Sequence, residues 1–126
     1  MHVIHLLFYF LNNLKVYHWN TKSYSRHKAS DSCFTDIQNT FDKFIEVYIG
    51  KYGRNKLFSH KSSNMKLITL DNVNDKEIIT LINQLISFLQ NLENELGLKS
   101  VDSELLNLRD EMLSTLNQTL YLFTLD

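Results

Sequence analysis

Two pairs of side chains in the first half of the sequence have the types and the spacing of metal ligands. His27 and Asp31 are four residues apart, and so are Asp42 and Glu46. Residues four apart in an α-helix lie on the same face, one turn from each other. Imidazole and carboxylate groups together form a mixed nitrogen and oxygen set that suits Fe(II) and that also binds Zn(II).

The two pairs share one helix face but lie too far apart to hold the same ion within one chain. Asp42 follows Asp31 by eleven positions, which is close to three whole turns and leaves the side chains within about 20° of each other. At about 1.5 Å per residue the two pairs are about 16 Å apart along the helix axis. Either the chain carries two unrelated half-sites, or a second copy of the helix runs antiparallel and joins the first pair of one chain to the second pair of the other.

Four stretches of the chain have apolar residues at helical spacing, and the sequence contains no proline to interrupt them. His18 continues the apolar stripe of the first stretch. We expect helices from about Val3 to Asn20, from a polar loop at Thr21 to Ser23 as far as about Gly50, from about Asp75 to Leu96, and from Asp102 to the end of the chain. Gly50 and Gly53 are expected terminators of the second helix and Gly97 of the third, and Asp102 is an expected N-cap.

The lengths of the loops predict how these helices are connected. Short loops join the first helix to the second and the third to the fourth, so each pair should be an antiparallel hairpin. The linker from about Tyr52 to Asn74 has over twenty residues, enough to span about 70 Å when extended. The sequence therefore predicts a single all-α domain over residues 1–126, a ferritin-like four-helix bundle with a long crossover between two hairpins.

The composition excludes several partners and compartments. The net charge is −1, so no overall field attracts nucleic acid or an anionic membrane. One cysteine, Cys33, excludes an internal disulfide framework and fits a reducing compartment. The first residues lack a basic leader, and their apolar run is too short to span a bilayer. We expect a soluble, cytoplasmic protein with neither nucleic acid nor membrane as a partner.

The segment Tyr17-His18-Trp19-Asn20-Thr21-Lys22, with the two ligand pairs after it, resembles the ferroxidase segment of Dps proteins, the mini-ferritins. In that family a histidine of a His-Trp-Asn motif ends the first helix. A His and an Asp four apart open the second helix, and an Asp and a Glu four apart follow eleven residues later. The run from Trp19 to Asp31 is most similar to uncharacterised Dps-like proteins of large DNA viruses. The specific match covers about Leu14 to Gly53.

The resemblance implies an iron-binding ferroxidase with its site shared across a two-fold dimer interface. Such a protein oxidises Fe(II) with peroxide or oxygen, limits oxidative damage and stores the ferric product. The implied metal ligands, which are also the catalytic residues, are His18, His27, Asp31, Asp42 and Glu46. Zn(II) is an alternative ion for the same ligands. The implied assembly is a homo-oligomer, at least a two-fold dimer and in the family a larger shell. The implied setting is a virus-infected cell or a virion.

The sequence departs from the Dps pattern at three points. The stretch between His18 and His27 is three residues shorter than usual, the chain is short for the family, and a lysine-rich N-terminal arm is absent from the sequence, so DNA binding is not carried over. The alternative function is a non-catalytic ferritin-like subunit of a virion or scaffold, with a structural metal or none. We favour the ferroxidase because all five ligand positions are filled together, and unpaired carboxylates at an interface are costly without a metal.

Overall fold

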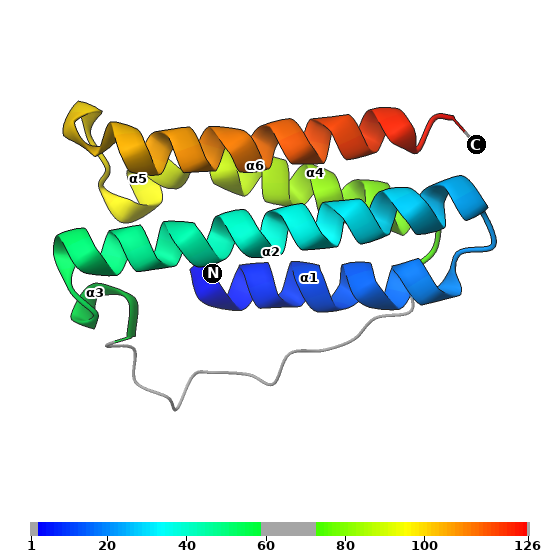
Figure 1. Ribbon diagram of the computed structural model, residues 1–126, viewed down its shortest axis with the longest axis horizontal. Coiled ribbons are helices and arrows are strands. Elements are labelled where there is room, and N and C mark those ends of the chain that lie inside the picture. The colour runs from blue at the N-terminus through cyan, green and yellow to red at the C-terminus, as the bar shows by residue number, and fades with distance from the viewer. Residues whose placement is uncertain (1–2, 59–72, 126) are drawn as a thin grey trace.

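The computed structural model describes residues 3–58 and 73–125, and within these ranges the regular secondary structure is entirely helical (Figure 1). The elements in chain order are α1 (Val3–Asn20), α2 (Tyr24–Tyr52), α3 (Asn55–Phe58), α4 (Glu77–Gln90), α5 (Leu92–Leu96), the 3₁₀-helix η2 (Ser100–Asp102) and α6 (Ser103–Leu122). The predicted all-α class is therefore confirmed. Among the described helices, none combines the length and apolar character needed to cross a bilayer.

The four longest helices, α1, α2, α4 and α6, lie side by side (Figure 1). Both α1 and α6 pack against α2 and against α4. A three-residue connection turns α1 back along α2, and α4 runs antiparallel to α6 (Figure 1). Helix α4 begins at the same end of the molecule as the α1–α2 turn, so it runs parallel to α2 (Figure 1). Of the predicted linker, residues 59–72 lie outside the described residues, and residues 55–58 form α3.

The core follows the apolar stripes expected from the sequence. In α1 the residues Leu7, Leu11, Leu14 and His18 are all buried, as the helical spacing predicts. The side chains with no exposed surface include Leu14, Ile37, Ile78, Ile82, Leu89, Leu105 and Leu116. Each large aliphatic side chain buried in this way contributes about 1.5–3 kcal/mol. Cys33 is buried among them, and this burial raises the pKa of its thiol to about 11, which keeps it unreactive.

One predicted helix terminator is confirmed, and one predicted helix is wrong. Helix α2 continues past Gly50 to Tyr52, and the predicted terminator Gly53 is its C-cap, with a φ of 84° that suits glycine and an N–H that donates to the Ile49 carbonyl at 2.8 Å. The third predicted helix is wrong as one unbroken element, because it divides at Asn91 into α4 and α5. The Asn91 side chain accepts a hydrogen bond from Asn94 at 2.8 Å, the local bonding by which asparagine competes with helix continuation.

The buried carboxylate of Asp102 binds two residues at the end of α2 and so holds the start of α6 in place. Asp102 occupies the predicted N-cap position, but its side chain makes no cap hydrogen bond to α6. It accepts instead from the Lys99 backbone N–H at 2.8 Å, from Lys51 Nζ at 2.8 Å and from the Tyr52 hydroxyl. These donors, Lys51 first, lower the pKa of Asp102 to about 2, and Asp102 raises the pKa of both Lys51 and Tyr52. The cluster joins the end of α2 to the start of α6.

This cluster predicts a specific loss of stability in acid. Because folding lowers the Asp102 pKa, its contribution is complete above the ordinary value of 3.8 and is lost as the pH falls to about 2. We expect Asp102→Asn to be less stable than wild type near neutral pH and to lose less stability over that acid interval. Urea titrations across this range measure both effects, with Glu104→Gln as the control because Glu104 is an exposed partner of the same lysine. Equal acid slopes for wild type and Asp102→Asn would contradict the prediction.

Candidate metal centre

Two of the predicted ligands, His18 and His27, form a stacked pair across the α1–α2 turn. His18 lies in the last turn of α1, and His27 lies in the first turn of α2. Ser23 caps α2 by accepting a hydrogen bond from the Arg26 backbone N–H at 3.2 Å. The imidazole centroids are 3.9 Å apart with an angle of 15° between the ring planes. The short turn therefore places both rings at one point, although they are nine residues apart.

Reciprocal hydrogen bonds to the backbone fix how each ring presents its nitrogens. His18 Nδ1 lies 2.7 Å from the His27 carbonyl oxygen, and His27 Nδ1 lies 2.8 Å from the His18 carbonyl oxygen. A carbonyl oxygen only accepts, so each Nδ1 carries the hydrogen and donates it. In a neutral imidazole this leaves the lone pair on Nε2, which is the usual state of a metal-binding histidine. Ser30 Oγ also lies 3.2 Å from His18 Nδ1 and donates to the His27 carbonyl at 3.1 Å.

The three predicted carboxylates, Asp31, Asp42 and Glu46, are all exposed along α2. Asp31 lies one turn after His27 and forms an ion pair with Lys15, with 3.6 Å between Nζ and Oδ1. Within residues 3–58 and 73–125 of a single chain, no three His, Cys, Asp or Glu side chains gather closely enough to hold a metal ion. One chain thus brings the two histidines together and leaves the carboxylates facing solvent.

Two large aromatic side chains close in sequence to the histidines, Trp19 and Tyr24, are open to solvent. Trp19 is 69% exposed and Tyr24 is 73% exposed, and the Tyr24 ring stacks toward His27 with 6.4 Å between centroids. Farther along the α1–α2 boundary, Phe8 is 47% exposed and meets Phe41 edge-on. Exposed aromatic residues of this size are more frequent at interfaces than on free surfaces.

Basic residues precede acidic residues over the first 46 positions of the chain, and this order includes the start of α2. Residues 1–30 contain four cations, Lys15, Lys22, Arg26 and Lys28, and no acidic residue, whereas residues 31–46 contain four acids and one lysine. The first turn of α2 therefore has no acidic side chain. The helix dipole favours acids at the N-terminus. The cations near the start of α2 are thus unfavourable to the helix dipole, whereas Lys51 in its last turn is favourable.

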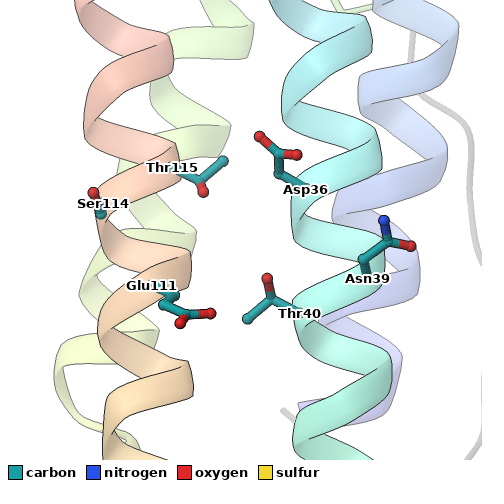
Figure 2. A pocket seen from close by; sticks show the side chains of 6 residues that line it. All are labelled: Asp36, Asn39, Thr40, Glu111, Ser114 and Thr115. Carbon is teal, nitrogen blue, oxygen red and sulfur yellow. The ribbon is translucent and has the colours of Figure 1, made fainter.

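A second polar surface lies between α2 and α6, where a shallow hollow has a volume of about 340 Å³ (Figure 2). Asp36 lies on the α2 wall and Glu111 on the α6 wall (Figure 2). The remaining lining residues are Asn39, Thr40, Ser114 and Thr115. Asp36 is also exposed, but it is about 180° from His27 around α2 at about 100° per residue. The hollow is therefore separate from the histidine pair.

The sequence prediction did not include three residues that contact these ligands. Ser30 hydrogen bonds to His18, Lys15 pairs with Asp31, and Tyr24 stacks toward His27. Ser30 and Tyr24 each lie three residues from His27, and three-residue spacing on a helix is a usable signal. The Lys15–Asp31 contact joins two helices, so it required the packed structure.

Comparison with known proteins assigns a family. The sequence matches, over residues 18–123, a family described as a family of unknown function (DUF5856), and the chain belongs to that family. The matched range includes all five predicted ligands. A segment of 37 residues is 51% identical to a protein of Enterobacteria phage T4 described as an uncharacterized 14.6 kDa protein in the mobD-ri intergenic region. That segment spans 29% of each chain. No solved structure matches the chain significantly.

The reciprocal bonds lead to a prediction on the metal-free protein. His18→Ala removes the stacked ring and leaves the His27 carbonyl without its imidazole donor, so it should destabilise the fold by about 1–3 kcal/mol. Urea unfolding measures this loss, and His5→Ala, a half-buried histidine in the same helix, should cost less. In nitrogen-detected NMR both neutral rings should be Nδ1–H tautomers, and an Nε2–H tautomer at either ring would contradict the hydrogen-bond assignment.

Proposed function

We propose that this chain is a ferritin-like, Dps-like protein that oxidises Fe(II) at a site shared across a two-fold homodimer interface. In this proposal His18, His27 and Asp31 come from one chain, and Asp42 and Glu46 come from its partner. The observation that carries it is the histidine pair, because both Nδ1 atoms are committed to backbone carbonyls and both Nε2 atoms are left to bind a metal.

The residues fit the proposed ion by their donor chemistry. Imidazole nitrogen and carboxylate oxygen together suit Fe(II), and carboxylates stabilise the added charge of Fe(III). When bound, Fe(II) supplies the electrons that reduce peroxide or oxygen. The protein's part is to hold the ion with preset imidazoles, to neutralise its charge and to leave coordination positions for the oxidant. Zn(II) fits the same donors, so metal content has to be measured as well as activity.

The charge and the exposed aromatics support a second copy of this chain as the partner. An antiparallel mate of α2, centred near Phe34 to Asn39, closes the gap of about 16 Å between the two ligand pairs. The same pairing sets the cationic first turn, with Lys28, against the partner's acidic segment, with Glu46. Because the dimer is two-fold symmetric, this contact between a cationic turn and the partner's acidic segment occurs twice. Trp19 and Phe8 supply apolar surface for such an interface.

The helix arrangement supports the ferritin-like part of the proposal. The pairs α1–α2 and α4–α6 are antiparallel, and α2 and α4 run in the same direction (Figure 1). A long crossover between two hairpins has this signature. The phage relative supports a virus-infected cell or a virion as the setting.

One observation favours the alternative, a non-catalytic structural subunit. Lys15 already pairs with Asp31, and this offsets the carboxylate charge without any metal. A structural role would keep the dimer and the histidine pair but would not turn over Fe(II). The rate of Fe(II) oxidation therefore separates the two functions.

Mixing two inactive variants tests whether the site is shared. His27→Ala and the double variant Asp42→Asn/Glu46→Gln should each lose Fe(II) oxidation. In a heterodimer of the two variants, one site keeps all its ligands. The other site has lost His27, Asp42 and Glu46 together. After co-refolding in equal amounts, activity should recover to about a quarter of wild type, because half of the dimers are mixed and each has one intact site.

The control for the mixing experiment is Asp36→Asn/Glu111→Gln, which neutralises two carboxylates of the α2–α6 hollow and should keep full activity. Wild-type activity in the Asp42→Asn/Glu46→Gln variant would exclude these ligands. Loss of activity in both variants without recovery on mixing would exclude the shared site.

Metal binding should also stabilise the fold. A ligand that binds only the native state at a hundredfold excess over its Kd adds about 2.7 kcal/mol for one site. Thermal melts with Fe(II) under anaerobic conditions, or with Zn(II), should show a rise in Tm for wild type and a smaller one for Asp31→Asn. No rise with either ion would favour the structural alternative.

A further inference from the structure

A second link between α1 and α2 is formed by Tyr17 and Arg26, each one residue before a histidine of the pair. The Arg26 guanidinium donates to the Tyr17 hydroxyl at 3.1 Å. The Tyr17 hydroxyl donates in turn to Asp75 Oδ1 at 2.8 Å, and Arg26 donates to the Asp75 backbone carbonyl at 3.1 Å. Tyr17 precedes His18 and Arg26 precedes His27, so the two links are neighbouring rungs between the same two helical turns.

The Arg26–Tyr17–Asp75 link connects α1 and α2 to residues that flank α4 and α6. Asp75 lies two residues before α4, and Phe123 follows α6. The Phe123 ring packs under the Arg26 guanidinium at 4.8 Å and beside the Tyr17 ring at 5.9 Å. Tyr17 is 1% exposed, whereas the Asp75 side chain is 61% exposed. The link therefore transmits the position of α4 and α6 to the turn that holds the histidines.

We propose that Tyr17 and Asp75 are positioning residues for the His18–His27 pair. The two Nδ1–carbonyl bonds of 2.7 and 2.8 Å both depend on the offset between the end of α1 and the start of α2. A hydrogen bond weakens steeply once the donor and acceptor separate beyond about 3.5 Å. A shift of one turn by about 1 Å would thus break both bonds and free the rings to change tautomer. The consequence for metal binding rests on the proposed function, but the consequence for the histidines does not.

The competing explanation is that the Tyr17–Asp75 bond only stabilises the fold. A matched control exists at the other end of the molecule, where Tyr52 donates to Asp102 beside Lys51. Tyr52→Phe deletes the same kind of hydroxyl from the same kind of tyrosine, aspartate and cation cluster. Tyr52 is the last residue of α2, whereas His27 lies in its first turn. A purely structural role predicts that Tyr17→Phe and Tyr52→Phe behave alike at the histidines.

The first measurement is nitrogen-detected NMR of the histidine rings in metal-free protein. Tyr17→Phe should shift His18 and His27 from Nδ1–H toward a mixture of tautomers, whereas Tyr52→Phe should leave them unchanged. Asp75→Ala is the second test variant, and since Asp75 is exposed, this variant keeps the buried packing intact. It should change the rings in the same direction. Unchanged rings in both Tyr17→Phe and Asp75→Ala would overturn the proposal.

The second measurement is the Kd for Zn(II) by calorimetry on the full chain. Loss of groups that orient metal-binding histidines costs about 10–100-fold in affinity, and Tyr17 acts one step farther out, so we expect about a threefold to tenfold loss in Tyr17→Phe. The Tyr52→Phe variant should bind as wild type does. If wild type binds no Zn(II) and no Fe(II), the proposed function fails, and the NMR result still decides the positioning role. Normal affinity in Tyr17→Phe with altered tautomers would overturn its part in metal binding.

Discussion

The connection of residues 21–23 between α1 and α2 is the constraint on which the site depends. Three residues are enough to reverse the chain and too few to let the two helices slide past each other. Thr21 and Ser23 fix this turn locally, since Thr21 Oγ1 accepts from the Ser23 N–H and Ser23 caps α2. The last turn of α1 therefore meets the first turn of α2 in one register. That register places His18 and His27 within reach of each other's carbonyl.

Helix α2 is fixed at both ends by the same chemistry. Near its start, Arg26 binds Tyr17 of α1, and Tyr17 binds Asp75, which lies two residues before α4. At its end, Tyr52, Lys51 and Asp102 join it to the start of α6. Each cluster combines a phenol, a cation and a carboxylate. They differ in burial, because Asp102 has no exposed surface, whereas Asp75 is largely open to solvent. The folded position of α2 is thus set from both sides of the molecule.

Between these ends, the faces of α2 have separate roles. One face enters the core through fully buried residues such as Ile37 and Phe44. Another borders α6 and lines the polar hollow with Asp36 and Thr40. The exposed remainder carries Asp31, Asp42 and Glu46, next to a cationic first turn that the helix dipole disfavours. Burial explains the first face and contact with α6 explains the second. On the third face, Asp31 pairs with Lys15 of α1, and Asp42 and Glu46 are exposed.

The sequence by itself determined the helical class, the bounds of α1 and the buried stripe through His18. These depend on local periodicity and on terminators such as Gly97, and both can be read within a few turns of chain. The spacing of His27, Asp31, Asp42 and Glu46 also placed them on one helix face without any structure. The tertiary structure alone decided which groups touch. It turned Asp102 from a helix cap into a partner of Lys51 and joined the imidazoles of His18 and His27 to each other's backbone. These contacts link residues 9 to 51 positions apart, and the packing of whole helices, rather than any local pattern, brings such residues together.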